Sequence, residues 1–285
     1  MEPIGDRLIV VSFDEPYLVN VCIVFGVNRN QAFILDTHLG PDSMKTVKEA
    51  IQEEAGAETP TVIFNSHADY DHVWGNCAFL ESTIIGHDQC RSRMISESKD
   101  ALMKYAEHKR GDVEIVLPNL TFRNRLSFTR ESLTFLHTPG HTRDSSSVLD
   151  GITNSLFVGD NVESPVPYVN TPDFEGYLRS LQWYREQNCE YLVSSHDPVM
   201  RDYELLEKNM EYLQSLSSWE LEIEPMDSDV RHVHMHNLDS LSDSFVDSKV
   251  PTAVEKHYRE AIHYLESLDT VDSPDLVERL RRVID

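Results

Sequence analysis

Histidine and aspartate residues repeatedly follow short apolar runs in this sequence. Such runs lead directly into Asp36 and Asp160, and runs that end in a short turn lead into His67, His141 and His196. Strand ends are where a rigid scaffold delivers functional side chains into a shared cleft. Imidazole and carboxylate groups are donors that zinc, iron and manganese accept. The five endings therefore predict that the chain gathers metal ligands in one cleft.

The densest group is the run His67-Ala68-Asp69-Tyr70-Asp71-His72. Residues two apart in an extended turn point the same way, so His67 and Asp69 can hold one metal ion. Asp71 and His72 then turn toward a second ion. Donors of these types at this density favour Zn, Fe or Mn over Ca or Mg alone. Taken by itself, so short a motif could also be a polar loop with incidental histidines.

Five motifs of the chain resemble those of the metallo-β-lactamase superfamily. HADYDHVWGN, which begins at His67, resembles the HxHxDH signature and the Gly-Asn turn that follows it. ILDT with Asp36, HTPGHT at His137–Thr142, FVGD at Phe157–Asp160 and SSHD ending at Asp197 resemble the first, third, fourth and fifth motifs. All five occur in family order, and the resemblance covers residues from about 7 to 200.

The resemblance implies two metal ions, each held by two imidazoles and one carboxylate and bridged by a further carboxylate. The ligands of the first ion would be His67, Asp69 and His141. The ligands of the second would be Asp71, His72 and His196, of which Asp71 is also predicted to be catalytic. Asp160 would be the bridge, and Asp36 would order the ligand loop by hydrogen bonds. Packing or hydrogen-bonding roles are expected for three further histidines, His38, His87 and His137.

One position departs from the common zinc hydrolases of this family, which carry histidine where this chain has Asp69. Each ion would then be coordinated by two imidazoles, one carboxylate of its own and the shared Asp160. That set is similar to the diiron flavodiiron proteins, which have HxExDH, as much as to the zinc enzymes. A harder, oxygen-richer set favours Fe or Mn. The expected cofactors are therefore two divalent metal ions, with Fe, Mn and Zn all candidates.

The predicted function is a binuclear metal-dependent hydrolase that acts through a metal-bridging hydroxide on a small ester, thioester, lactone or related substrate. Metal charge lowers the pKa of bound water from about 16 toward ~7, so no Ser or Cys nucleophile is required. The alternative is a diiron oxidoreductase that reduces O₂ or NO, although the segment after residue 200 is too short and too helical for a flavodoxin module. A non-catalytic binder or sensor is a third hypothesis. The intact set of seven ligands argues against it, because a sensor does not need so many.

The order of the apolar runs predicts an α/β fold, an αββα sandwich of two mixed β-sheets with outer helices. Early strands follow one another closely and later strands are separated by helices, which favours two sheets over a doubly wound parallel sheet. The expected strands are Leu8–Phe13, Leu18–Phe25, Ala32–Leu35, Val62–Phe64, Thr83–Ile85, Val113–Leu117, Leu133–Leu136, Ser155–Val158 and Tyr191–Val193. The expected helices among them are Pro41–Glu54, His87–His108 and Asp173–Gln187.

The rest of the chain has a different pattern. Residues 1–201 are expected to form the metallo-β-lactamase-fold domain, and residues 202–285 a helical extension packed on it that helps wall the pocket. Helices are expected at Asp202–Leu216, Pro251–Leu268 and Pro274–Val283, and an Asp- and Ser-rich loop at Met226–Lys249. If that loop is extended, three imidazoles would share one face as an accessory metal site or pocket rim, namely His232, His234 and His236. A solvated edge strand or loop is the alternative.

Composition limits the partners. With 49 acidic and 25 basic residues the formal net charge is −24, which makes nucleic-acid binding unfavourable. There is no apolar run of 18 residues and the start has no secretory pattern, so neither a membrane span nor export is expected. The expectation is a cytoplasmic protein whose partner is a small-molecule substrate, with a homodimer possible.

Overall fold

The computed structural model describes residues 1–245, 250–268 and 273–284, and the chain forms two compact units. The first unit consists of Met1–Pro139, Arg143–Gly159 and Gln187–Asp202. The second consists of Gly140–Thr142, Asp160–Glu186 and Tyr203–Asp285. The domain boundary after residue 201 stays a prediction, since the second unit also takes in two segments from within the predicted first domain.

A seven-stranded mixed sheet in the first unit follows chain order from β1 to β7. Its strands are β1 (Glu2–Ile4), β2 (Leu8–Phe13), β3 (Val19–Phe25), β4 (Ala32–Leu35), β5 (Thr61–Asn65), β6 (Thr83–His87) and β7 (Leu120–Phe122). Neighbours from β1 to β4 are antiparallel and those from β4 to β7 are parallel. Every residue of β3 and β4 is buried, which explains their continuous apolar sequences.

The second sheet of this unit has five strands in the order β12-β11-β10-β9-β8. They are β8 (Arg125–Phe128), β9 (Leu133–His137), β10 (Ser146–Asp150), β11 (Ser155–Gly159) and β12 (Tyr191–Ser194). The pairs from β8 to β11 are antiparallel, and β11 and β12 are parallel. Both sheets are therefore mixed, as the sequence predicted.

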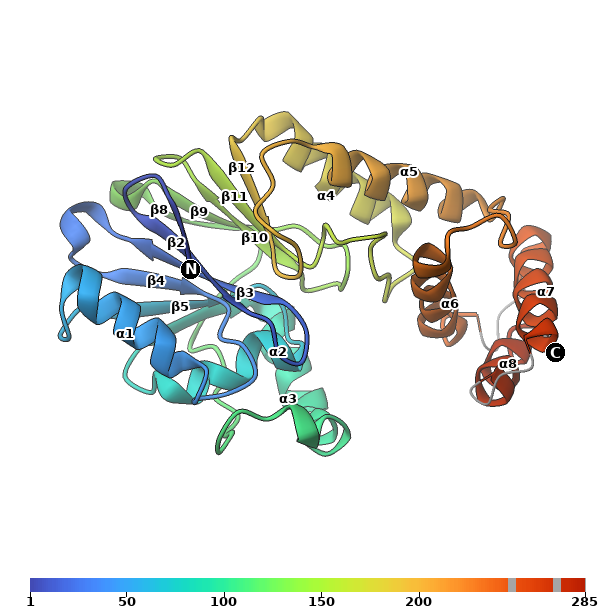
Figure 1. The fold of residues 1–285 in the computed structure, drawn as a ribbon, viewed down its shortest axis with the longest axis horizontal. Helices are drawn as coiled ribbons and strands as arrows, with labels where there is room; N and C mark the ends of the chain where they lie inside the picture. The colour runs from blue at the N-terminus through green and yellow to red at the C-terminus, as the bar shows by residue number, and fades with distance from the viewer. Residues whose placement is uncertain (246–249, 269–272, 285) are drawn as a thin grey trace. The chain divides into compact units, whose positions relative to one another are not determined.

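The two sheets pack face to face through one apolar core (Figure 1). Phe33 and Phe64 of the first sheet contact Phe135 of the second, with ring centroids 6.4 Å and 4.9 Å away. Burying each such ring contributes roughly 1.5–3 kcal/mol. Helix α1 (Met44–Ala55) covers the outer face of the seven-stranded sheet, and α3 (Asp88–Lys104) follows β6. This rigid double layer carries the loops that end in Asp36, His67 and His196.

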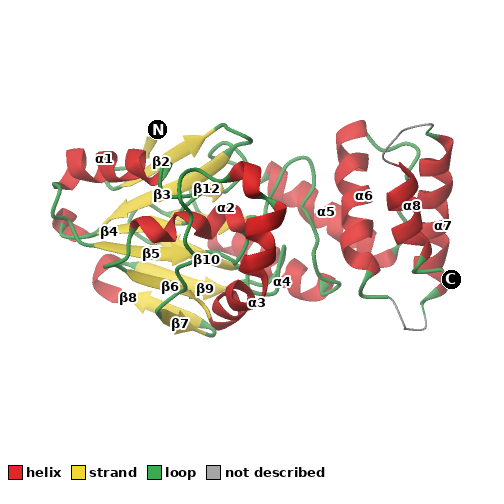
Figure 2. Ribbon diagram, turned by 90° about the horizontal axis from the view of Figure 1, so that it is seen from below, coloured by secondary structure: helices red, strands yellow, loops and turns green. Residues whose placement is uncertain are grey.

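The second unit is helical among its described residues (Figure 2). Its helices are α4 (Phe174–Gln187), α5 (Glu204–Ser218), α6 (Ser228–Ser242), α7 (Thr252–Ser267) and α8 (Ser273–Arg281). Leu238 of α6, Tyr258 of α7 and Leu280 of α8 meet in one apolar cluster and are fully buried. Across the described part of the chain, no helix combines the length and apolarity needed to cross a membrane.

Eight of the nine expected strands are present, and the prediction at Val113–Leu117 is wrong. Its apolar side chains pack beside Trp74 and Met94 without joining a sheet, because burial alone makes a loop look like a strand. Four strands were not predicted: β1, β7, β8 and β10. Strand β10 begins with two buried serines, Ser146 and Ser147, so it lacks the apolar run on which the prediction relied.

The loop predicted at Met226–Lys249 is also wrong, because Ser228–Ser242 forms α6. The side chain of Asp227 caps this helix by accepting from the Asp229 N–H at 3.0 Å, so its acidic start is a helix signal. Residues 246–249 lie outside the described residues. In a helix the three imidazoles cannot share one face: His234 is buried, whereas His232 and His236 are exposed.

A buried ion pair ties the two sheets together and yields a test of this architecture. Arg7, between β1 and β2, donates through Nε to Asp150 of β10 at 3.0 Å and through Nη2 to the Glu131 carbonyl at 2.8 Å. We expect Arg7→Met to lower the free energy of unfolding by about 3–5 kcal/mol, because Asp150 would stay buried without its partner. Urea denaturation of the full chain measures this.

The matched control is Arg29→Met, which removes a pair with Glu54 whose side chains are 39% and 43% exposed. An exposed pair of this kind contributes about 0–1 kcal/mol. Equal destabilisation by the two variants would contradict the cross-sheet role of Arg7.

Candidate metal centre

Asp36 follows β4 and holds the loop that leaves β5. Its Oδ1 accepts from the Ser66 backbone N–H at 2.7 Å, and its Oδ2 accepts from the Ser66 hydroxyl at 2.7 Å. Oδ2 also lies 2.8 Å from Nδ1 of His72. An ionised carboxylate only accepts, so Nδ1 of His72 carries the ring proton and Nε2 is the atom able to bind metal. The hydrogen bonds expected of Asp36 are thus present.

His67 is oriented by the same network. Its Nδ1 lies 3.0 Å from Oγ of Ser66. Because the Ser66 hydroxyl proton is directed at Asp36, the oxygen accepts and Nδ1 of His67 donates. The rings of His67 and His72 lie side by side, with centroids 4.1 Å apart. One buried carboxylate therefore sets the orientation of two predicted ligands.

Gly75 allows the ligand loop to close onto the turn after β4. A β-carbon at Gly75 would lie 1.9 Å from the carbonyl oxygen of Thr37, a distance that backbone atoms cannot relieve without moving. The Thr37 N–H in turn donates to the carbonyl of His72 at 2.9 Å. The Gly-Asn turn of the motif thus has a packing reason, which is the close approach of two backbone segments.

Asp71, His72 and His196 form a group whose ligand atoms all lie within 4.8 Å of one another. Asp71 is in the short helix α2 (Tyr70–Val73), and His196 follows β12. Nε2 of His72 lies 3.5 Å from Oδ1 of Asp71, and Nε2 of His196 lies 3.6 Å from Oδ2 of the same carboxylate. The three residues predicted for the second ion therefore come together within the first unit.

The start of β3 fixes the position of His196. The Leu18 carbonyl accepts from Nδ1 of His196 at 2.7 Å, which again leaves Nε2 as the donor atom for metal. The amide of Asn20 donates to the carbonyls of Ser194 and Asp197 at 2.9 and 2.7 Å. The sequence motifs predict no role for Asn20. The one sequence feature that could have indicated a role for Asn20 is that it is a single amide in the otherwise apolar run of β3, where it is buried.

The donor set fits a transition-metal ion. Imidazole–carboxylate separations of 3.4–3.6 Å in the first unit are too long for good hydrogen bonds. Two ligands of one tetrahedral ion with bonds of about 2.1 Å are separated by about 3.4 Å. With each Nδ1 hydrogen-bonded to the protein, the donors are of the type, and at the spacing, that zinc, iron or manganese requires.

Asp69 is paired with an arginine that the sequence motifs do not indicate. Its Oδ2 lies 3.4 Å from Nε2 of His67, while its Oδ1 accepts from Nη2 of Arg93 at 2.8 Å. Arg93 also donates to Asp144 at 2.6 Å, and Asp144 accepts from the Ala68 N–H at 2.9 Å. Burial alone would lower the pKa of Arg93, but the Asp69 and Asp144 carboxylates raise it overall. The guanidinium therefore stays charged beside Asp69.

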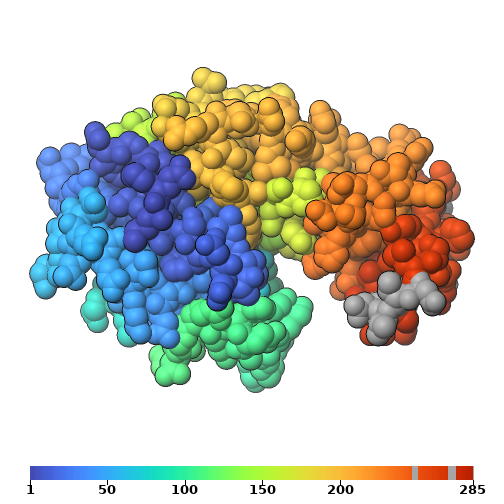
Figure 3. All heavy atoms as spheres, in the orientation of Figure 1, coloured from blue at the N-terminus to red at the C-terminus, as the bar shows by residue number. Residues whose placement is uncertain are grey.

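Arg93 lies on α3, which is at the surface of the first unit (Figure 3). Nothing in the spacing of the motifs connects it to Asp69, since an arginine on a largely exposed amphipathic helix is ordinary. Only the fold brings the two together. The extra negative charge at Asp69, which by itself favours iron or manganese, is partly offset by Arg93, whose single positive charge is shared with Asp144 and Glu97.

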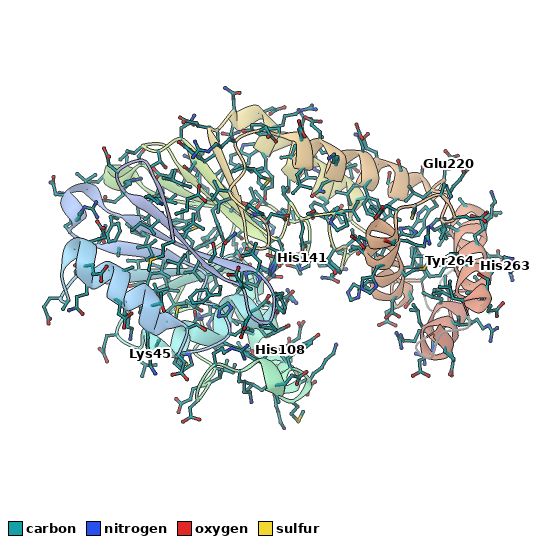
Figure 4. The ribbon with its side chains drawn as sticks, viewed as in Figure 1. Lys45, His108, His141, Glu220, His263 and Tyr264 are labelled. Carbon is teal, nitrogen blue, oxygen red and sulfur yellow. The ribbon has the colours of Figure 1, made fainter. Side chains whose placement is uncertain are left out.

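Tyrosine side chains lie beside the carboxylate of Asp71. The Tyr17 hydroxyl is 3.1 Å from Oδ2 of Asp71 and 2.6 Å from the Tyr70 hydroxyl. Burial raises the pKa of Tyr17 strongly and that of Tyr70 to about 12, and the Asp71 charge adds to both. Tyr70 stacks on Tyr105 at 4.1 Å and lies 5.8 Å from His108, which is labelled in Figure 4. Both phenols are therefore neutral donors at physiological pH.

In the second unit His141 and Asp160 lie near each other. Nε2 of His141, labelled in Figure 4, is 3.9 Å from Oδ2 of Asp160. The Tyr168 carbonyl lies 3.2 Å from Nδ1 of His141 and can only accept, so this ring also carries its proton on Nδ1. The His141 N–H donates to Oδ1 of Asn161 at 2.9 Å. The ligand roles of both residues stay predictions.

The three histidines for which packing or hydrogen-bonding roles were expected have structural contacts. His38 lies 2.7 Å from the Ser43 hydroxyl and stacks on Phe13, and burial lowers its pKa to about 4. His87 stacks on His137 at 3.8 Å and accepts from the Gln89 N–H at the start of α3. None of the three belongs to the groups of potential ligands found among the described residues.

Comparison with known structures shows the fold. A metallo-beta-lactamase from Pontibacter korlensis is 17% identical, covers 75% of this chain and 97% of its own, and superposes with a TM-score of 0.59. The DIM-1 metallo-beta-lactamase is 17% identical with a TM-score of 0.57, covering 76% of this chain and 97% of its own. A metallo beta lactamase from Hirschia baltica is 14% identical with a TM-score of 0.54, covering 72% and 92%. The predicted αββα sandwich of two mixed sheets is confirmed.

Sequence comparison identifies the family. A search of curated proteins found no match. The family model described as the metallo-beta-lactamase superfamily matches residues 16–196. That segment contains the possible metal ligands of the first unit, Asp71, His72 and His196. It also contains His141 and Asp160 of the second unit. The chain therefore belongs to the metallo-beta-lactamase superfamily.

Proposed function

We propose that this protein is a binuclear metal-dependent hydrolase. Membership of the superfamily suggests a metal-dependent hydrolase. The observation that carries the proposal is the group of Asp71, His72 and His196, in which both rings use Nδ1 for a protein acceptor and turn Nε2 toward one carboxylate. Such preorganisation is costly to build by chance, because two buried polar side chains and a partly buried one must be oriented at once.

The proposed ligands of the first ion are His67, Asp69 and His141, and those of the second are Asp71, His72 and His196. Asp160 is the proposed bridge, since its family motif follows β11 and its carboxylate lies beside His141. Two such ions, when bound, polarise a substrate oxygen and lower the pKa of water toward neutrality. The proposed substrate is a small ester, thioester, lactone or related compound.

The protein's own groups have separate proposed roles in this site. Asp71 is the proposed catalytic residue, because its carboxylate lies between two ligand imidazoles and can hold and orient a water molecule by hydrogen bonding. Tyr17 donates to Oδ2 of Asp71 and keeps that carboxylate in one orientation. Asp36 and the Leu18 carbonyl hold the imidazoles in the tautomer that binds metal.

No observation favours the diiron oxidoreductase alternative. Its main support was the carboxylate of Asp69, which adds one negative charge to the first site. Arg93, at 2.8 Å from that carboxylate, supplies the opposite charge. The electrostatic case for a harder or more oxidised ion is correspondingly weaker.

Removal of His196 should abolish binding of one ion. We expect His196→Ala to hold at least one equivalent of metal less than wild type and to lose hydrolysis of a thioester, lactone and phosphodiester panel. His196 lies on a turn above the core, so far-ultraviolet circular dichroism should be unchanged. The control is His137→Ala, which removes a stacked surface-side imidazole outside the group. If both variants retained the metal content of wild type, His196 would not be a ligand.

Arg93 should tune the metal preference of the first site. Full-length wild type and Arg93→Met are loaded anaerobically with equal Fe(II), Mn(II) and Zn(II). Without the guanidinium the Asp69 charge is uncompensated, so the ratio of iron plus manganese to zinc should rise by about ten-fold. Asp69→His should move this ratio toward zinc.

The matched control is Arg91→Met, on the same helix, whose Nε instead donates to the Pro118 carbonyl at 3.1 Å. It should leave the ratio at the wild-type value. An unchanged ratio in Arg93→Met, with folding verified, would show that the Asp69 charge does not govern metal choice.

A further inference from the structure

Asn237 of α6 clamps the segment that follows Asp160. Its side chain is fully buried, and its Oδ1 accepts from the Val169 N–H at 2.8 Å. Its Nδ2 donates to the Pro167 carbonyl at 2.9 Å. These two bonds grip the backbone immediately before and after Tyr168. Both contacts lie within the second unit.

The clamped residue is the one that orients His141. The Tyr168 carbonyl accepts from Nδ1 of His141 at 3.2 Å, and the Asn170 N–H donates to the carbonyl of His141 at 3.2 Å. Val169, between them, is fully buried and anchors the segment. The position of the Tyr168 carbonyl therefore determines which nitrogen of His141 carries the proton.

A continuous chain of buried hydrogen bonds extends from the clamp to α7. Because the Asn237 amide is fixed by the 167–169 backbone, its second N–H points to the Tyr212 hydroxyl, 2.9 Å away. Tyr212 then accepts from Asn237 and must donate to Nδ1 of His234, at 2.9 Å. His234 accordingly donates from Nε2 to Nε2 of His257, also at 2.9 Å. Each hydrogen bond in this series therefore has a defined donor and acceptor.

The electrostatics agree with this order. Burial lowers the pKa of His234 to about 3, with the neighbouring His257 adding to the effect, and burial likewise lowers the pKa of His257. Both imidazoles are therefore neutral, as a chain with one proton per bond requires. His234, which the sequence grouped with two exposed histidines as an accessory metal site, is instead a link between α5, α6 and α7.

We propose that Asn237 is a positioning residue for His141, and that α5 and α6 hold it in place through Tyr212 and His234. This inference rests on the proposed function, in which His141 binds metal through Nε2. In this arrangement the C-terminal helices hold the Tyr168 carbonyl where it keeps the proton of His141 on Nδ1. Helix packing alone would need none of these polar contacts, since the α6–α8 cluster is apolar.

The test compares full-length variants by titration with Zn²⁺ alone and with Co²⁺ alone. Asn237→Ala should weaken binding of one of the two ions by about 10–100-fold, as loss of a ligand's hydrogen-bond partner does in other metal sites. Its Co²⁺ absorption spectrum should change, and amide exchange at Tyr168 to Asn170 in metal-free protein should accelerate. Tyr212→Phe removes one hydroxyl and should produce the same changes to a smaller degree.

The matched control is Tyr258→Phe, which removes a buried hydroxyl bonded to the Leu238 carbonyl at 2.8 Å in the same helical unit but outside the chain. It should lower thermal stability without changing the Zn²⁺ affinity or the Co²⁺ spectrum. If Asn237→Ala does not fold, Tyr212→Phe decides.

If Asn237→Ala and Tyr212→Phe fold and keep the wild-type Zn²⁺ affinity and Co²⁺ spectrum, the positioning role is overturned. An equal effect of Tyr258→Phe would also overturn it. Failure of wild type itself to bind either ion would instead refute the proposed function. The two failures are therefore distinguishable in one set of titrations.

Discussion

The carboxylate of Asp36 accepts three hydrogen bonds, and the orientation of the ligand loop depends on them. Two come from Ser66 and one from His72, and Ser66 passes the constraint on to His67. The same principle recurs where no carboxylate is available. Backbone carbonyls of Leu18 and Tyr168 accept from His196 and His141. All four imidazoles thus use Nδ1 for the protein, and each turns Nε2 toward an aspartate.

Charge balance at the first site is set by the fold and not by the motif. The HxDxDH sequence places one more carboxylate at the centre than the common zinc pattern, and the chain as a whole carries an excess of acid. Arg93 forms a small ionic network behind Asp69 together with Asp144 and Glu97, which places one positive charge beside Asp69 and holds its other oxygen toward His67. Metal choice should therefore be judged from the whole network and not from the ligand types alone.

Much of the fold and of the ligand loop could be predicted because the signals are local. A strand that leads into Asp36, or through one residue into His67, is visible in a few residues, and the order of the apolar runs and helices predicts two sheets. What could not be predicted depends on distant segments. Arg93 meets Asp69, Asn20 holds the turn before His196, and Asn237 grips residues 167–169 only after folding. Helix α6 was missed because its buried face contains histidine and asparagine, which make an interior helix look like a polar loop.

The hydrogen bonds at Nδ1 fix the tautomer of the proposed ligand imidazoles before any metal arrives. Long-range ¹H–¹⁵N correlation spectra of the metal-free protein report these tautomers, and they are recorded at about pH 8, above the ordinary histidine pKa of about 6.5. His72, His141 and His196 should appear with the proton on Nδ1, and substitution of each in turn assigns its signals. Signals showing these rings protonated on Nε2, or exchanging between both forms, would show that the protein does not fix the tautomer.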